Sequence, residues 1–264
     1  MYNLMAKSDP FISDDQTMCS LEKRGPIFVL TLTGDGDHRL GPDVIAAIRV
    51  ALATARKEAL STPDGAALVT TAQGRFFSNG FDLGWANAAG SPSAARARLE
   101  SMVSLFAPVV ADLLTLPMPT IAAITGHAAA AGFALAMSHD HVLMREDRGV
   151  VYMSEMDLGL PFPEYFMVLM RSKIVDPRTL RDVALGAMKI GGKEAKERGI
   201  VDRVYPGPEE TLEAAMKLGE QLAGRGWVGT VYAETRRAAF PELCKAVVGV
   251  DDEEKEKVIA ASKL

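Results

Sequence analysis

The sequence has little cysteine and histidine, and its acidic residues outnumber its lysines and arginines, 34 to 29. Its 264 residues include two cysteines, Cys19 and Cys244, too few for a disulfide framework, and no CxxC motif or Cys/His cluster suggests zinc. His38, His139 and His141 show no metal-ligand spacing with acids, so we expect no bound metal. The formal net charge of −5 excludes the basic surface typical of nucleic-acid-binding proteins. No apolar run reaches the roughly 18 residues needed to cross a membrane, so we expect no membrane span.

The composition suits one globular domain with a large core, because 48% of the residues are hydrophobic and 24% are charged. Residues 1–17 lack the basic start and apolar core of a secretory signal, and we expect them to form a disordered extension. We expect residues 18–205 to form an α/β core and residues 206–250 a helical region. Residues 251–264 should form a polar tail.

The last three residues are Ser262-Lys263-Leu264, which match a peroxisomal address read by an import receptor. The preceding run, residues 251–257, is strongly polar and should keep this signal accessible. We therefore expect a peroxisomal protein with the import receptor as a partner. Peroxisomes host fatty-acyl-CoA metabolism, so the signal also favours an acyl-CoA substrate.

Hydrophobic periodicity predicts strands that alternate with helices. Apolar β-formers indicate strands, and apolar residues at helical spacing indicate helices, several of which begin with proline. The expected strands are 27–32, 66–70, 120–124, 141–144 and 150–153, and the expected helices are 42–60, 92–116, 177–186, 208–223 and 228–247. This order indicates an α/β fold followed by a helical C-terminal part.

Two segments that follow strands combine glycine with small or aromatic residues. Residues 125–137 lack any acid and should form a tight turn and the start of a helix, where unpaired N–H groups can hold an anionic oxygen. Residues 74–84 should form a loop at the end of the strand before them. Two such loops at consecutive strands could each direct one N–H group at a common oxygen.

With these motifs the chain resembles the enoyl-CoA hydratase/isomerase (crotonase) family. The resemblance covers about residues 21–248 and includes the loop at 74–84, the stretch at 119–132 and a third motif from Gly186 to Val204. It implies stacked ββα turns in a superhelix with a C-terminal helical region, and assembly as trimers or hexamers. It further implies a fatty enoyl-CoA thioester as substrate and no separate cofactor, since CoA is part of the substrate.

The resemblance also implies an oxyanion hole made of two backbone N–H groups, those of Phe81 and Ala131. Asp82, Leu83 and Gly84 would continue the contact with the acyl-CoA. Removing a proton next to a thioester places negative charge on the carbonyl oxygen. Two donors directed at that oxygen stabilise the dienolate more than the ground state, by about 3 kcal/mol for a typical donor.

The expected base distinguishes the reactions within the family. Typical hydratases of the family handle water with two glutamates, and the matching positions here are Ala134 and Glu155. A single carboxylate can take a proton from C2 and return it to C4 without water. This pattern resembles the Δ3,Δ2-enoyl-CoA isomerase branch, and we expect that activity. A hydratase, a thioester hydrolase or a non-catalytic acyl-CoA-binding relative remain as alternatives.

Three acids are candidates for the base. Glu155 matches the position used by hydratases and mitochondrial-type isomerases. Glu164 lies close to where peroxisomal-type isomerases carry theirs, at a spacing that differs by one or two residues, and Asp157 is a third candidate. Apolar neighbours should raise the pKa of the base toward neutrality, and the expected neighbours are Met153, Met156, Leu160 and Phe162.

Other polar residues have less specific expectations. His127 precedes the oxyanion residue, and we expect it to hydrogen bond to the turn rather than act as a general base. Arg24, Arg39 and Arg75 are candidates to meet the CoA phosphates, and the sequence does not choose among them.

Overall fold

The computed structural model describes residues 18–61 and 65–248. The expected extension at 1–17 and the tail with its peroxisomal signal at 251–264 lie outside these residues. Within the described ranges no helix is long and apolar enough to cross a membrane.

The larger sheet has six strands in the order β1-β2-β3-β5-β7-β10. The outer strand β1 is antiparallel to β2, and the other neighbours are parallel. Its strands are β1 (Cys19–Arg24), β2 (Ile27–Leu32), β3 (Ala67–Ala72), β5 (Thr120–Ile124), β7 (His141–Arg145) and β10 (Arg203–Tyr205).

A second sheet of four strands lies beside the first, in the order β4-β6-β8-β9. Along the chain, β3, β5 and β7 each enter the larger sheet, and the strand that follows each of them enters the smaller one. This alternation is the expected stack of ββα turns, so the predicted fold class is confirmed. The smaller sheet contains β4 (Phe76–Ser78), β6 (His127–Ala129), β8 (Val150–Tyr152) and β9 (Ile190–Gly191).

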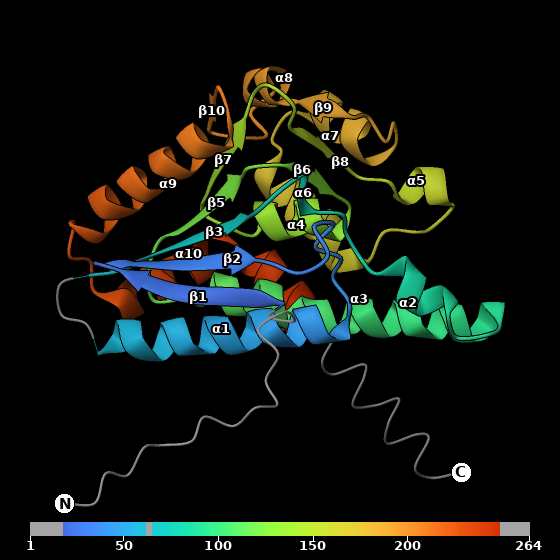
Figure 1. Ribbon diagram of the computed structural model, residues 1–264, viewed down its shortest axis with the longest axis horizontal. Coiled ribbons are helices and arrows are strands. Elements are labelled where there is room, and N and C mark those ends of the chain that lie inside the picture. The colour runs from blue at the N-terminus through green and yellow to red at the C-terminus, as the bar shows by residue number, and fades with distance from the viewer. Residues whose placement is uncertain (1–17, 62–64, 249–264) are drawn as a thin grey trace, which may run out of the picture.

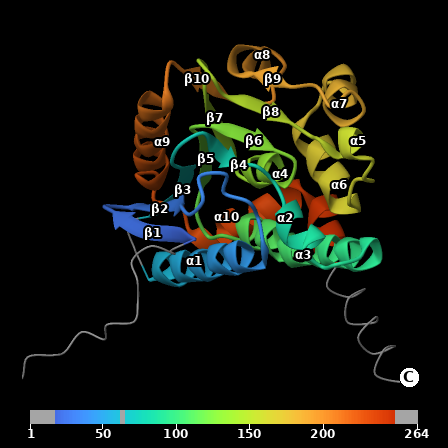
Figure 2. The ribbon, with the colours of Figure 1, turned by 45° about the vertical axis from the view of Figure 1, so that its right-hand side comes forward.

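Helices cover both faces of the larger sheet (Figure 1; Figure 2). On one face, Val29, Val69 and Ile121 pack against α9, and on the other, Leu30 and Leu68 join the main core formed with α1, α3 and α4. The helices are α1 (Pro42–Leu60), α2 (Leu83–Asn87), α3 (Pro92–Leu114), α4 (Ala131–Met137), α5 (Glu155–Leu158), α6 (Glu164–Lys173), α7 (Pro177–Ala184), α8 (Gly192–Glu197), α9 (Pro208–Ala223) and α10 (Gly229–Ala239).

The C-terminal part differs from the single helix expected over 228–247. Helix α10 ends at Ala239, and Phe240 has non-helical backbone angles of φ −127° and ψ 56°. Residues 241–248 form a further helical segment. Pro241 explains the break, because proline disfavours a helical conformation at the residue before it. After the break, Leu243 and Val247 pack into the main core.

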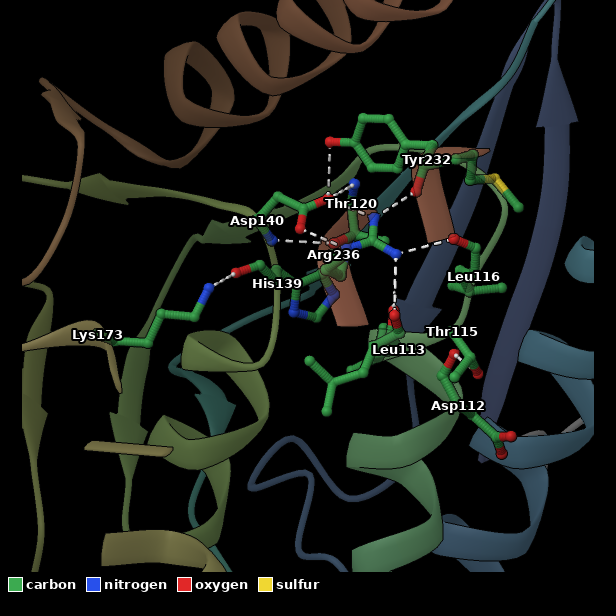
Figure 3. A network of polar contacts seen from close by, with 12 residues as sticks. Asp112, Leu113, Thr115, Leu116, Thr120, His139, Asp140, Lys173, Tyr232 and Arg236 are labelled. Carbon is green, nitrogen blue, oxygen red and sulfur yellow. Dashed lines mark hydrogen bonds and ion pairs between the residues drawn. The ribbon is translucent and has the colours of Figure 1, made fainter. Parts of the chain in front are cut away.

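Arg236 connects α10 to the core (Figure 3). Arg236 is 5% exposed, and its guanidinium forms an ion pair with Asp140, which lies directly before β7. It also donates to the backbone oxygens of Leu116 and Met118, at 2.8 and 2.6 Å, just past the end of α3. The five donors of a guanidinium allow one side chain to hold the three segments together. The C-terminal region is therefore docked by a buried polar network as well as by apolar contacts.

Candidate active site

The loop after β4 approaches the turn after β6 closely. Gly80 has φ +78°, a conformation that favours glycine. A Cβ atom on Gly80 would lie 3.1 Å from the Ala129 oxygen and 3.5 Å from the Ala131 nitrogen. The two loops expected to hold a common oxygen are therefore side by side.

The start of α4 is held in an unusual backbone conformation. Ala130 has φ +47° and ψ −122°, a region that L-residues rarely occupy. The N–H group of Ala130 donates to the Tyr152 oxygen of β8 at 2.9 Å, which anchors this turn to the smaller sheet. Next to it, Gly132 packs directly on β4, since a Cβ there would lie 2.3 Å from the Ser78 oxygen. Neighbouring strands thus hold the turn that carries Ala131.

Phe81 and Ala131 have N–H groups that are free to bind a ligand. Neither group donates to an acceptor within residues 18–61 and 65–248. Ala131 is the first residue of α4, where the helix provides no acceptor for its N–H. The structure therefore brings together the two donors named from the sequence, and their joint action on one oxygen remains a prediction.

A cavity of about 1010 Å³ opens beside Phe81. Phe81 and Leu83 line it, whereas Asp82, Gly84 and Ala131 do not. The Asp82 carboxylate instead caps α2, accepting from the Trp85 N–H at 2.9 Å. The rest of the wall comes from α2, α3, the segment from α5 to α6, and residues 241–248. The volume of the cavity lies at the upper end of the usual range for ligand pockets.

Glu155 is the acid best placed for chemistry in this cavity. It begins α5, lines the cavity and is 7% exposed. Its Oε2 atom is buried and has no hydrogen-bond partner among the described residues. Burial raises the pKa of the Glu155 carboxyl to about 7, although hydrogen bonds from the backbone of Glu155 and Ser154 oppose the rise. The carboxyl can therefore hold or release a proton near neutral pH.

The surroundings of Glu155 agree in part with those expected. Met153 is fully buried, and Leu160 and Phe162 line the same cavity. Met156 was expected among these neighbours, but it is 52% exposed because the single turn of α5 directs it away from the core. The raised pKa is consistent with the prediction that the site is apolar.

The other two acids lie in different environments. Glu164 begins α6 and lines the cavity, but it is exposed to solvent. Asp157 is exposed and does not line the cavity. Ala134, where a hydratase of the family would carry a second glutamate, is fully buried in α4. Among the described residues that line the cavity, Glu155 is thus the only buried carboxylate.

His127 does not make the expected hydrogen bond from its side chain. Its ring packs edge-on against Phe76 at 5.3 Å, and its Nδ1 atom is buried without a partner in the described part of the chain. The backbone N–H of His127 donates to the Arg75 oxygen instead, at 2.9 Å. Burial, followed by the charges of Arg75 and Arg145, lowers the pKa of this imidazole. His127 is therefore hydrogen bonded through its backbone, while its ring makes an aromatic contact with Phe76.

The three arginines considered for the CoA phosphates lie in two places. Arg24 is on the outer strand β1 and pairs with Glu22 at 2.7 Å. Arg39 precedes Leu40, whose N–H donates to the Gly80 oxygen, and the backbone oxygen of Arg75 accepts from the His127 N–H. Arg39 and Arg75 are therefore next to the loops that carry Phe81 and Ala131.

Two polar residues near the site were not singled out for a role in it. His38 is 3% exposed and Ser78 fully buried, and both hydrogen bond to the loop that carries Phe81. Ser78 belongs to the family motif in the loop at 74–84, where residues 77–83 read F-S-x-G-x-D-L. His38 stands in a turn-rich segment, and its sequence neighbours carry no signal that would place it beside that loop.

Comparison with known proteins agrees with the geometry. A family model described as enoyl-CoA hydratase/isomerase matches residues 41–246. The chain is 52% identical to peroxisomal enoyl-CoA delta isomerase 2 of Arabidopsis thaliana, over 94% of this chain and 100% of the relative. It is 47% identical to peroxisomal enoyl-CoA delta isomerase 1 of the same plant, over 88% and 93%.

Solved structures share the fold. A probable enoyl-CoA hydratase from Mycobacterium tuberculosis superposes with a TM-score of 0.79 at 23% identity, over 93% of this chain and 98% of that chain. An enoyl-CoA hydratase from Mycobacterium marinum superposes with a TM-score of 0.77 at 26% identity, over 91% and 99%. The similarity extends over nearly the whole of both chains.

Proposed function

The chain belongs to the enoyl-CoA hydratase/isomerase family, and on this basis we propose that it is a Δ3,Δ2-enoyl-CoA isomerase. It would convert 3-enoyl-CoA to trans-2-enoyl-CoA in the β-oxidation of unsaturated fatty acids. The observation that carries the proposal is the single buried carboxylate, Glu155, on a large cavity beside two free N–H groups. The names of the Arabidopsis relatives support the same activity.

In the proposed reaction the thioester oxygen binds between the N–H groups of Phe81 and Ala131. The ionised Glu155 removes a proton from C2, and the electrons of that C–H bond form a dienolate that the two donors stabilise. The now neutral Glu155 returns the proton to C4, and the double bond moves to C2–C3. No water, oxidant or separate cofactor enters this balance. A base with a pKa near 7 suits both halves of the transfer.

Hydration of a 2-enoyl-CoA is less well supported. Adding water across the double bond requires one group that positions and activates the water molecule. It also requires a second group that delivers a proton to the substrate. Ala134 offers no carboxylate for this, and it is enclosed in the core. Glu164 is the alternative base for the isomerase, but as an exposed group it lacks the burial that raises the pKa of Glu155.

We also propose a peroxisomal location and a homotrimeric or hexameric assembly. Ser262-Lys263-Leu264 would bind the import receptor, and two of the relatives are named peroxisomal. The oligomer follows the pattern of the family. Light scattering on the purified protein would measure the oligomer, and a fluorescent fusion that keeps the C-terminus free would report the location.

The deciding experiment incubates purified protein with 3-hexenoyl-CoA and follows the absorbance of the conjugated thioester. Formation of the 2-enoyl product supports the isomerase. Faster water addition to trans-2-hexenoyl-CoA would favour a hydratase, and release of free CoA, detected with a thiol reagent, would favour a thioester hydrolase. Thermal stabilisation by acyl-CoA without any turnover would indicate a binding protein.

A further inference from the structure

His38 is buried against the loop that carries Phe81. Its Nδ1 atom lies 2.9 Å from the Phe76 oxygen of β4. A carbonyl oxygen can only accept a hydrogen bond, so Nδ1 carries the proton and donates. His38 also has φ +47°, and its own N–H donates to the Asp35 carboxylate at 2.9 Å. The segment before α1 is thus held in a tight turn with the imidazole directed at β4.

Ser78 completes a ring of hydrogen bonds around the same loop. Its hydroxyl is fully buried and donates to the His38 oxygen at 2.7 Å. The Gly80 N–H donates to the Ser78 Oγ at 3.4 Å, and the Leu40 N–H donates to the Gly80 oxygen at 2.8 Å. From Phe76 to Gly80, the backbone is therefore tied at three points to residues 38–40.

This ring determines where the N–H of Phe81 lies. The two loops leave little room for a side chain at Gly80, since a Cβ there would lie 3.1 Å from both the Ala129 oxygen and the Ala130 Cβ, so a shift of the loop changes the relation between the two oxyanion donors. An oxyanion hole depends on donors placed within a few tenths of an ångström, and misplacement by about 1 Å can lower a rate about 100-fold. His38 itself does not line the cavity.

We propose that His38 is a positioning residue for the oxyanion hole, acting through Phe76 and Ser78 on the N–H of Phe81. The inference rests on the proposed function, because it assigns His38 a part in stabilising the enolate. A buried, hydrogen-bonded histidine can instead serve stability alone, and that role would change the amount of folded protein without changing the properties of the hole.

The test uses two variants that both tolerate a positive φ. His38→Asn places its side-chain N–H close to the position of Nδ1, and His38→Gly removes the donor. The main measurement is the apparent pKa of a bound 3-ketoacyl-CoA, whose enolate has its own near-ultraviolet band. The wild-type hole stabilises the enolate and lowers this pKa. Isomerase kcat and KM are measured on the same preparations.

We expect His38→Gly to raise the pKa of the bound enolate by about one unit and to lower kcat about tenfold or more, with a smaller change in KM. His38→Asn should restore both values to near wild type. Ser78→Ala removes the hydroxyl while the volume of the side chain stays nearly the same, and it should change the enolate pKa and kcat in the same direction as His38→Gly. It serves as the test if the glycine variant does not fold.

An unchanged enolate pKa in both His38→Gly and Ser78→Ala, or a loss in His38→Asn equal to that in His38→Gly, would overturn the inference. The failure of the proposed function is a separate result. If the wild-type protein does not isomerise 3-hexenoyl-CoA, the function is wrong, while the enolate pKa still reports whether His38 positions the two donors.

Discussion

Gly80 lies beside Ala131, and a Cβ on the glycine would be in van der Waals contact with the alanine nitrogen, at 3.5 Å. The same Cβ would lie 3.1 Å from both the Ala129 oxygen and the Ala130 Cβ. These contacts link the loop after β4 to the start of α4, and they make the spacing of the two proposed oxyanion donors sensitive to a single methyl group.

Gly80→Ala should therefore impair catalysis. We expect kcat/KM to fall about 100-fold, because the added methyl group separates the loops and the positive φ strains the chain. Gly74→Ala is the matched control: Gly74 also has a positive φ, +89°, but a Cβ there would meet nothing within 4 Å. Steady-state kinetics of both variants separates the close contact from the backbone strain. Equal losses in both would show that the close contact with Ala129 and Ala130 is unimportant.

Glu155→Gln should abolish most of the isomerase activity, with a fall in kcat of about 10²–10⁴-fold, since glutamine cannot accept the proton from C2. Glu164→Gln, an exposed acid on the same cavity, should keep activity within about threefold of wild type. Rates on 3-hexenoyl-CoA measure both. A larger loss in Glu164→Gln than in Glu155→Gln would identify Glu164 as the base.

The wild-type rate should depend on the ionisation of Glu155. Burial raises the pKa of its carboxyl to about 7, and only the ionised form removes a proton. We expect kcat/KM to fall about tenfold for each pH unit below 7 and to level off above it. A profile that stays flat between pH 5 and pH 8 would contradict this assignment of the base.

The same pKa shift predicts how stability depends on pH. The pKa of Glu155 is higher in the folded state, about 7, than its ordinary value of 4.5. The shift therefore lowers stability increasingly as pH rises from 4.5 to 7, because the unfolded chain ionises first. The full penalty, up to about 3 kcal/mol, applies above pH 7. Urea unfolding should show Glu155→Gln to be more stable than wild type at pH 8 and nearly equal at pH 4.5. A stability difference that does not change with pH would contradict the raised pKa.

Arg236→Met should destabilise the protein by about 3–5 kcal/mol, because it leaves Asp140 buried and unpaired and removes donors from four backbone oxygens. Burial alone would raise the pKa of Asp140, but the hydrogen bond and charge of Arg236 hold it below its usual value. Arg237→Met, at the exposed neighbouring position, should change stability by less than about 0.5 kcal/mol.

Chemical denaturation of these two variants gives the free energies directly. In a double-mutant cycle, Asp140→Asn combined with Arg236→Met should cost less than the sum of the single changes. Additive effects would show that the ion pair is not coupled.

Much of the architecture could be predicted from local patterns. The bounds of α1, α9, β2 and β5 agree with the ranges expected from periodicity, because proline starts and apolar spacing are local signals. The family motifs likewise identified the loops that carry Phe81 and Ala131. The break at Phe240 could also have been predicted, since Pro241 is visible in the sequence.

The choice among the acids could not be made in this way. Glu155 and Glu164 are both glutamates at the start of a helix, and both line the cavity, yet only Glu155 is buried. Burial depends on which distant segments pack over a side chain, and no local pattern encodes that. The environment of Glu155 therefore required the folded chain.

The sequence by itself determined the family, the order of strands and helices, and the absence of a glutamate at position 134, because these are properties of residue identity and spacing. Only the tertiary structure decided that Gly80 meets Ala131, that His38 supports the loop of Phe81 and that burial raises the pKa of Glu155. These relations join residues far apart in the chain, and they arise from close packing and desolvation, which exist only after the segments come together.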